Sequence, residues 1–444
     1  MKNHININLA LTMMISAFIM IAYSSCTIEK VEDPNFPSIG TLENNASVDE
    51  MNNLVSGTLS GMRNFLDTYV DDCSIIGRDY YRISGADPRF TGELLGNSGS
   101  TLDNAAFYIV NPWSQFYRVV RNGWVLRHAV ENTPAAITQE QKNGYLGFAK
   151  TMQALELLYA SNMTYNNGIR TDVEDPNNMG PIVSYAQALI DIAALLDEGY
   201  TDLQNSGTEF LFTLSSGFDG FNTPAEFSKF NRGLKARVDV YSGNFSEAIT
   251  DLSASFINAS GDLYAGTYVS FSTASGDIPN VLYKPLNSVE TDSRVVQESY
   301  VTDAEPGDAR LSKASLRATT AQSPDSLSSN YDVNVWSSQD APVSIIRNEE
   351  LILISAEAKI QTGDLAGAKT DLDAVRIAAG LPAYAGIIDQ ASLTDEMLKQ
   401  RRYSLFAEAH RWIDMRRYNR LDQLPIDRVS DDVWVEFPLP VSEF

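Results

Sequence analysis

Two segments of the chain repeat one another, and this repeat constrains the fold more than any other feature. Each segment has the pattern of a helix, a glycine-centred turn and a second helix, and equivalent residues such as Ala236 and Ala356 lie 120 positions apart. Small alanines at a crossing let two helices pack closely, and a glycine ends a helix because it readily adopts the left-handed conformation. The matching residues are Ala236, Gly243, Phe245, Ala248, Thr250, Asp251 and Leu252 in the first copy and Ala356, Gly363, Leu365, Ala368, Thr370, Asp371 and Leu372 in the second.

The remaining chain has a helical period as well, because apolar residues spaced alternately three and four apart form a stripe along one side of a helix. Segments 113–130 and 139–162 are a further candidate pair, with Trp113, Phe116 and Tyr117 expected in the core. The pattern predicts an all-α protein of helix pairs that resemble tetratricopeptide units. The pairs are not in tandem, so an open solenoid is not expected. The clearest stripe consists of Tyr145, Phe148, Met152, Leu155 and Tyr159.

Four segments between the helices are long and rich in Gly, Ser, Asn and Asp: residues 83–104, 164–181, 199–223 and 259–343. Loops of this length in a compact domain usually carry function. We therefore expect a helical scaffold with long irregular loops that hold the ligand site.

The first 25 residues have the layout of a signal peptide. An acid-free, mostly apolar run follows Lys2, and Ser24-Ser25-Cys26 resembles the lipobox at which lipoproteins are cleaved. We expect Cys26 to be the lipidated first residue of the mature protein, residues 26–45 to be a flexible tether, and residues 46–444 to form a single domain. A membrane span of the same length is the alternative, although polar residues interrupt the run.

Charge and cysteine content exclude two classes of protein. The formal net charge is −24, and no run of Lys or Arg forms a basic stripe, so a nucleic-acid partner is not expected. If Cys26 carries lipid, Cys73 is the remaining cysteine, and a disulfide framework is impossible. Stability must then come from a hydrophobic core, which a chain of 444 residues can supply.

An enzyme would need a cluster of titratable or metal-binding residues. Beyond the signal peptide the histidines are His128 and His410, so a zinc site lacks ligands. The chain also has no Gly-x-Ser-x-Gly elbow, phosphate-binding loop or dinucleotide fingerprint. We predict no catalytic residue, no metal ion and no cofactor. Two alternatives stay open: the paired carboxylates of a glycosidase, and a structural calcium ion bound by oxygen ligands such as those of residues 172–175.

The C-terminal part of the chain resembles one family. Residues 347–382 are similar to the helical pair, and residues 400–417 to the signature, of the SusD/RagB-like outer-membrane nutrient-binding lipoproteins. Ala409 stands where the family usually has Gly, Gln400 stands where an acid is common, and the tail 437–440 is again similar. The matching signature positions are Arg402, Leu405, Glu408, His410, Arg411, Trp412, Asp414 and Arg416.

The residue pattern of this signature indicates that it holds the fold together. Its apolar stripe predicts a helix that starts at Thr394 and buries Trp412. His410 then has no catalytic role. The expected ion pairs join Glu408 to Arg411 and Asp414 to Arg417.

The resemblance implies a SusD-like scaffold and a non-enzymatic lipoprotein, exposed on the cell surface and anchored in the outer membrane through Cys26. Such a protein binds nutrient oligomers, in the first place oligosaccharides. It delivers them to a SusC-like TonB-dependent barrel, over which it acts as a hinged lid. Peptide binding of the RagB type, a surface glycan hydrolase and a structural adhesin are the alternatives.

Aromatic residues in loops are the candidate ligand contacts, because sugar faces stack on aromatic rings while Arg, Asn and Asp bond the hydroxyls. Two stretches combine these residue types, and we predict that they converge on one groove although some 200 residues separate them. The alternative is that each ring packs beneath its own loop. The candidates are Tyr80, Tyr81, Arg82 and Arg89 in the first stretch and Tyr283, Arg294, Tyr300, Tyr331 and Trp336 in the second.

Overall fold

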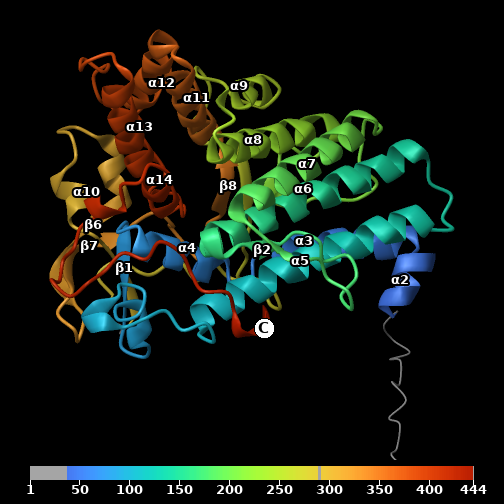
Figure 1. Ribbon diagram of the computed structural model, residues 1–444, viewed down its shortest axis with the longest axis horizontal. Coiled ribbons are helices and arrows are strands. Elements are labelled where there is room, and N and C mark those ends of the chain that lie inside the picture. Colours follow the sequence, from blue (N-terminus) through green and yellow to red (C-terminus); the bar gives the residue numbers. More distant parts are fainter. Residues whose placement is uncertain (1–37, 289–291, 444) are drawn as a thin grey trace, which may run out of the picture.

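The computed structural model describes residues 38–288 and 292–443, and helices dominate it (Figure 1). Four long helices lie side by side at one end, and the C-terminal helices cluster at the other. The predicted all-α scaffold is confirmed. None of the described helices is both long and apolar enough to span a membrane. The long helices are α5 (Phe107–Asn132), α6 (Gln139–Thr164), α7 (Tyr185–Gln204) and α8 (Pro224–Ser242), and the C-terminal ones are α11 (Asn348–Thr362), α12 (Leu365–Ala378), α13 (Gln390–Ser404) and α14 (Arg411–Arg417).

The predicted helix pairs are present. The repeat corresponds to α8 with α9 (Phe245–Ser253) and to α11 with α12. Gly243 and Gly363 end the first helix of each pair with φ angles of 77° and 90°, the left-handed conformation that favours glycine. The repeat alanines are fully buried, as are most side chains of the α6 stripe. Trp113 and Phe116 lie in the core as expected, and Tyr117 is half-buried against it.

The N-terminal part of the described chain corrects one prediction. Residues 39–45 are not a tether: they form α2 (Ile39–Asn45), which Ser38 caps by accepting a hydrogen bond from the Thr41 amide at 3.2 Å. Glu43 of α2 pairs with Arg121 of α5 at 2.7 Å, which fastens the helix to the scaffold. The signal peptide and Cys26 lie outside the described residues. After α2 come α3 (Val48–Gly61) and α4 (Leu66–Ile76).

The long middle segment is less irregular than its composition predicts. It contains a short helix and most of a four-stranded sheet of order β1-β5-β7-β6. In this sheet β1 pairs antiparallel with β5, with Arg82 opposite Arg294, so the chain near residue 80 lies beside a segment more than 200 residues later. The elements are β1 (Tyr80–Ser84), β4 (Gly266–Val269), β5 (Asp292–Val296), α10 (Ser299–Thr302), β6 (Ala314–Gln322), β7 (Ser328–Val333) and β8 (Val343–Arg347); β4 pairs with β8, and β2 (Ile169–Arg170) with β3 (Ile182–Val183).

Candidate functional site

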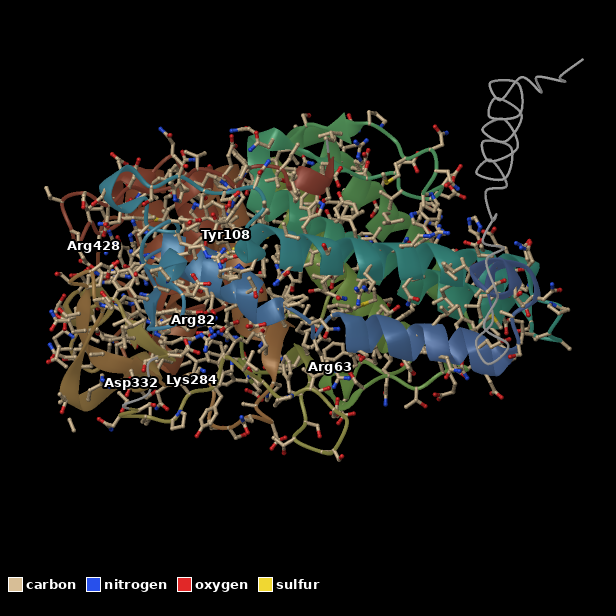
Figure 2. The ribbon with its side chains drawn as sticks, turned by 90° about the horizontal axis from the view of Figure 1, so that it is seen from below. Arg63, Arg82, Tyr108, Lys284, Asp332 and Arg428 are labelled. Carbon is tan, nitrogen blue, oxygen red and sulfur yellow. The ribbon has the colours of Figure 1, made fainter. Side chains whose placement is uncertain are left out.

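An open groove of about 560 Å³ lies where the turn after α3, the start of α4 and β1 meet the middle segment. Figure 2 looks onto this side of the molecule, with Arg63 and Arg82 on the N-terminal segment and Lys284 on the middle one. The first predicted stretch lines this groove through residues between Arg82 and Phe90, whereas the second, residues 283–336, contributes only Asp292 among the described residues. The predicted groove shared by the aromatic rings of both stretches is therefore not formed. The lining residues of the open groove are Arg63, Asn64, Phe65, Asp67, Thr68, Arg82, Ser84, Ala86, Asp87, Phe90, Phe107, Asn111, Phe271, Ile278, Pro279, Asn280, Val281, Leu282 and Asp292.

Phe65 occupies the turn between α3 and α4 in an unusual conformation. Its backbone is left-handed, with φ at 56°, and its side chain is 42% exposed, whereas the next residue, Leu66, is buried. A bulky residue in this region of the backbone map is uncommon and costs on the order of 1–3 kcal/mol. The turn therefore holds an aromatic ring in the groove at the expense of backbone strain.

Other aromatic rings and the Arg82 guanidinium form the walls, and the Arg89 guanidinium stacks on one of these rings from beside the groove. The Arg82 guanidinium lies 4.2 Å from the ring centroid of Phe90, and that of Arg89 lies 4.6 Å from the ring of Phe107. Phe271, from the segment after β4, is half-buried and contributes a ring from the middle segment. Arginine stacking of this kind fixes the rings in place. The groove consequently has rigid apolar walls.

A buried carboxylate organises the charges beneath the groove. Asp71 on α4 binds Arg82 at 2.9 Å and Arg294 at 2.6 Å, and Arg82 also binds Asp292 at 2.8 Å. Although burial alone would raise it, hydrogen bonds from Arg82 and Lys284 hold the pKa of Asp292 well below its usual range. These contacts leave the arginines neutralised by acids of the same chain.

Asp67 differs from the other groove carboxylates, because within the described residues it forms no direct ion pair. Burial raises the pKa of Asp67, and the nearby Asp71 carboxylate raises it further. A carboxyl group in this setting accepts hydrogen bonds when ionised and also donates one when protonated. It is therefore suited to bond a neutral polar ligand such as a sugar hydroxyl.

The site residues predicted from the sequence divide into three groups: one that lines the groove, five that are buried and three that lie outside the groove lining. Arg82 lines the groove as predicted. Five of the other predicted residues, four of them aromatic, are buried and do not reach it. Tyr80 donates to Asp71 at 2.7 Å, and Tyr300 donates to the Arg310 carbonyl at 3.0 Å beneath Tyr403 and Phe406. The assignment as ligand contacts is therefore wrong for Tyr80, Tyr81, Arg294, Tyr300 and Trp336, whose exposures are 0%, 1%, 3%, 1% and 6%.

The remaining three candidates lie outside the groove lining. Arg89 stands beside the groove, where it pairs with Asp87 at 2.7 Å and stacks on Phe107. Tyr283 and Tyr331 are half-buried residues packed against the core. Their contact with a ligand stays a prediction.

Sequence reasoning missed Phe65, Phe107 and Phe271, as well as Asp67 and Asn111. Phe65, Phe107 and Phe271 lie outside the two stretches in which aromatic residues are combined with Arg and Asp. Phe271 was within reach, since it stands in a run of serines, where no packing pattern requires a ring. Phe65 gave a weaker signal, an aromatic residue after Arg63-Asn64 at a helix end.

The C-terminal signature is part of the core, as predicted. Trp412 is fully buried, and its indole donates to the Trp434 carbonyl at 2.7 Å. Asp414 binds Arg401 at 2.7 Å and Arg417 at 2.9 Å, which confirms the pair with Arg417. The other expected pair is wrong: Glu408 binds Arg347 at 2.9 Å, while Arg411 donates to the Gly77 carbonyl at 2.9 Å.

The signature is also two helices rather than one. α13 begins at Gln390 with Asp389 as its cap, so the predicted start at Thr394 is wrong, and it ends at Ser404. Ala407 and Ala409 both have φ at 63°, which turns the chain before α14. The left-handed backbone at Ala409 is a physical reason for glycine at this family position.

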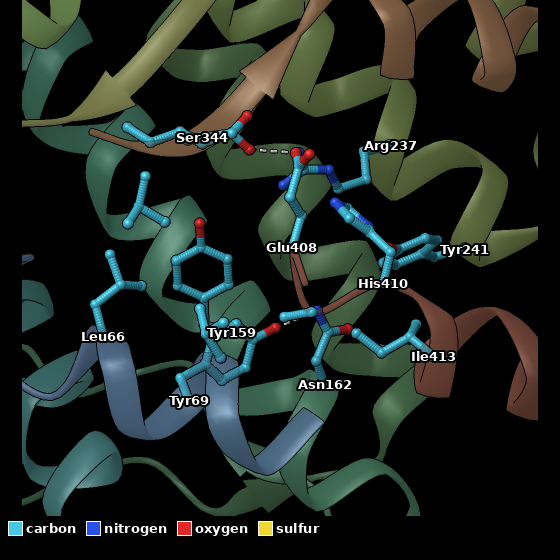
Figure 3. Close-up of a pocket in the computed structure, with 14 residues that line it drawn as sticks. Leu66, Tyr69, Tyr159, Asn162, Arg237, Tyr241, Ser344, Glu408, His410 and Ile413 are labelled. Atoms are coloured by element: carbon cyan, nitrogen blue, oxygen red, sulfur yellow. Dashed lines mark hydrogen bonds between the residues drawn. The ribbon is translucent and has the colours of Figure 1, made fainter. Parts of the chain in front are cut away.

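His410 lines an enclosed cavity of about 20 Å³ between Tyr159, Arg237 and Glu408 (Figure 3). This volume holds roughly one water molecule. Burial lowers the pKa of His410 to about 4, so its ring is neutral at pH 7. The cavity is too small for a substrate, and the cluster around His410 is a part of the core.

Away from the groove, another open hollow of about 380 Å³ lies beside Trp124 on the face of α5, α6 and α7. The Trp124 ring is stacked by Arg127, whose guanidinium lies 3.8 Å from its centroid. This contact already covers one face of the ring. The hollow is therefore the weaker candidate for stacking a ligand.

No group of three or more His, Cys, Asp or Glu side chains within residues 38–288 and 292–443 is arranged to hold a metal ion. In the acidic loop, Glu174 binds His128 at 2.8 Å, and Asp175 accepts a hydrogen bond from the Asn177 amide at 2.9 Å. A structural calcium ion at residues 172–175 was an alternative to the predicted absence of a metal, and it stays untested.

Known proteins share both sequence and fold with this chain. Residues 309–429 match the profile of the SusD family. SusD-like protein P38 of Formosa agariphila is 28% identical over 145 residues, which make up 30% of this chain and 29% of that protein. The matched part thus spans less than a third of this relative.

Solved structures extend the likeness to most of the chain. A laminarin-binding SusD-like protein superposes with a TM-score of 0.65 at 18% identity, over 90% of this chain and 97% of its own. Surface glycan-binding protein A from Bacteroides uniformis gives a TM-score of 0.68 at 14% identity, over 89% and 97%. Residues 309–429 are therefore similar in sequence to the SusD family, and the overall fold of the chain is that of SusD-like structures.

Proposed function

We propose that this protein binds oligosaccharides in the groove around Phe65 and does not cleave them. The observation that carries the proposal is the Phe65 ring, which is 42% exposed on a left-handed backbone. A residue that served packing alone would bury its ring and relax its backbone. Strain of this kind is retained at sites where a ligand is bound.

The groove also has the polar groups that sugar hydroxyls require. Asn64, Asn111 and Asp67 lie among the aromatic walls. An aromatic ring that stacks on a ligand contributes on the order of 1 kcal/mol beyond its buried area. Two of the solved proteins with this fold are described as laminarin-binding and glycan-binding, which supports a carbohydrate ligand over a peptide.

The test is a glycan array beside a peptide pool, with wild-type protein, Phe65→Ala and a matched control. Tyr264→Ala is the control, because Tyr264 is 61% exposed and does not line the groove. We expect oligosaccharide binding that Phe65→Ala weakens severalfold and Tyr264→Ala leaves unchanged. Binding of peptides alone, binding of neither class, or release of new reducing ends would each contradict the proposal.

We further propose that the protein is lipidated on Cys26, exposed on the cell surface, and delivers its ligand to a SusC-like TonB-dependent barrel. The support is the Ser-Ser-Cys sequence after an acid-free apolar run, together with the match of residues 309–429 to the SusD family. Cys26→Ala should abolish incorporation of labelled fatty acid and partitioning with the outer membrane. Cys73→Ala is the control, since Cys73 is buried in α4 and should not affect lipidation. Unchanged partitioning of Cys26→Ala would refute the anchor.

A further inference from the structure

The groove continues into a second hollow of about 440 Å³ along α3. Arg63 and Phe271 line both hollows, so the two are adjoining parts of one trough. Arg63 forms an ion pair with Asp277, and this pair stands at the junction. The second hollow is lined by Ser56, Leu59, Ser60, Arg63, Thr213, Leu214, Ser215, Ser216, Ser270, Phe271, Ser272 and Asp277.

The chemistry of the two hollows differs. The first has the rings of Phe65, Phe90 and Phe107, whereas Phe271 is the single aromatic residue among the described residues that line the second. Hydroxyl groups predominate in the second hollow, and they come from three segments: α3, residues 213–216 and residues 270–272. A hydroxyl both donates and accepts hydrogen bonds. Such a lining suits a ligand that is itself rich in hydroxyls.

The charges of the trough disfavour an anionic ligand. Both arginines that line it are already paired with carboxylates, Arg63 with Asp277 and Arg82 with Asp71 and Asp292. Asp67 adds a carboxyl group that has no direct ion pair within the described residues. Carboxylate and sulfate groups are usually bound by an arginine fork that is free to receive them. To bind them here, the ligand would have to displace an aspartate.

We propose that the ligand is an extended, uncharged oligosaccharide whose units occupy both hollows at once. Sugar faces would stack on Phe65 and Phe271 in the first hollow, and the following units would bond the serine and threonine hydroxyls in the second. The Arg63–Asp277 pair would lie beneath the chain where it crosses. This inference rests on the proposed function and adds to it the length and the charge class of the glycan.

The first test uses wild-type protein and calorimetry. The probes are a ladder of neutral oligosaccharides, from disaccharide to octasaccharide, prepared from the polysaccharide that binds on the array, with laminarin tried first. A matched sample of the same polysaccharide, oxidised to carry carboxylates, tests the charge. We expect affinity to rise along the ladder by about tenfold or more, which corresponds to about 1.4 kcal/mol, and oxidation to weaken binding. Equal affinity along the ladder, or tighter binding of the oxidised sample, would overturn the inference.

The second test fills the second hollow. Ser56 is exposed on α3 and lines this hollow, so Ser56→Trp should block it without disturbing the core. Asn53→Trp is the control, since Asn53 is exposed on the same helix and lines neither hollow. We expect Ser56→Trp to weaken octasaccharide binding about tenfold and to spare the disaccharide, while Asn53→Trp spares both.

The outcomes separate this inference from the proposed function. If glycans bind and Phe65→Ala weakens their binding, but Ser56→Trp leaves octasaccharide binding unchanged, the extended site is refuted and the proposed function stands. If no glycan binds to wild-type protein, the proposed function falls, and this inference falls with it.

Discussion

The C-terminal helices and the groove differ in what surrounds their side chains. In the C-terminal region the charged groups are buried and paired within the chain, as in Arg347 with Glu408 and Arg401 with Asp414. In the groove, Phe65 stands partly in solvent, and Asp67 has no direct ion pair among the described residues. Substitutions in the first region should therefore change stability, whereas truncation of the exposed Phe65 ring in the second should change binding alone.

The largest expected effect is that of Trp412→Ala. The fully buried indole packs against the Phe437 ring at 5.8 Å and donates to the Trp434 carbonyl. Removing a large buried aromatic usually costs about 3–5 kcal/mol. Urea unfolding should show this loss, and Trp124→Ala, at a half-buried tryptophan, should cost less. If both variants lost equally little stability, the signature would not be a core element.

A pH-dependent effect is expected at Asp79, which directly precedes β1 and contacts the C-terminal signature. Its carboxylate accepts a hydrogen bond from the Ala407 amide at 3.3 Å, and burial raises the pKa of Asp79 to about 7 although Arg411 lies nearby. In the unfolded chain this group ionises near its ordinary pKa of 3.8. Between about pH 4 and 7 the unfolded state thus binds fewer protons than the folded one, and stability falls as pH rises.

Asp79→Asn imitates the protonated form and should remove this pH dependence of the stability. The variant should match the wild type near pH 4 and exceed it above pH 7, by at most a few kcal/mol. Unfolding free energies measured across this range check the sign. A variant that is less stable than the wild type above pH 7 would show that the ionised Asp79 stabilises the fold.

A smaller, stabilising effect is expected for Ala409→Gly. Ala409 has φ at 63°, and a left-handed backbone costs a residue with a side chain roughly 1–2 kcal/mol. Glycine removes this cost, but part of the gain in stability is offset by the greater freedom of glycine in the unfolded chain. We therefore expect a net gain of about 1 kcal/mol or less. The control is Ala358→Gly, in the helical backbone of α11, which should lose stability. A loss at position 409 as well would mean that its backbone is not strained.

The smallest effect on stability is expected for Phe65→Ala. Exposed side chains usually change stability by less than about 0.5 kcal/mol when truncated, so the melting temperature should stay near that of the wild type while glycan binding weakens. A clear loss of stability would place Phe65 in the core rather than in a binding site, and would remove the contrast between the two regions.

Much of the scaffold could be predicted from the sequence, because helical packing leaves a periodic trace. Gly243 and Gly363 marked the ends of two helices, and the buried stripe of α6 was visible as spacing. The break in the signature was not visible, since alanines at positions 407 and 409 favour a helix and tertiary contacts impose their left-handed backbone.

The groove was predicted only in part. β1 pairs with β5, so the two stretches lie side by side, but the predicted groove shared by their aromatic rings does not form. The aromatic contacts were wrong because both faces of β1 are covered at its start: Tyr80 and Tyr81 point to opposite faces and both are buried, while Arg82 reaches the groove. Which residues of a loop remain uncovered depends on distant segments that pack over it, and a single sequence carries no periodic trace of those contacts.

The most direct test of the central claim is a crystal structure of the protein with the oligosaccharide that binds most tightly on the array. We predict sugar density against Phe65 and Phe271, continuing past Arg63 into the hydroxyl-lined hollow. Sugar bound instead in the hollow beside Trp124, with the groove around Phe65 empty, would contradict the account.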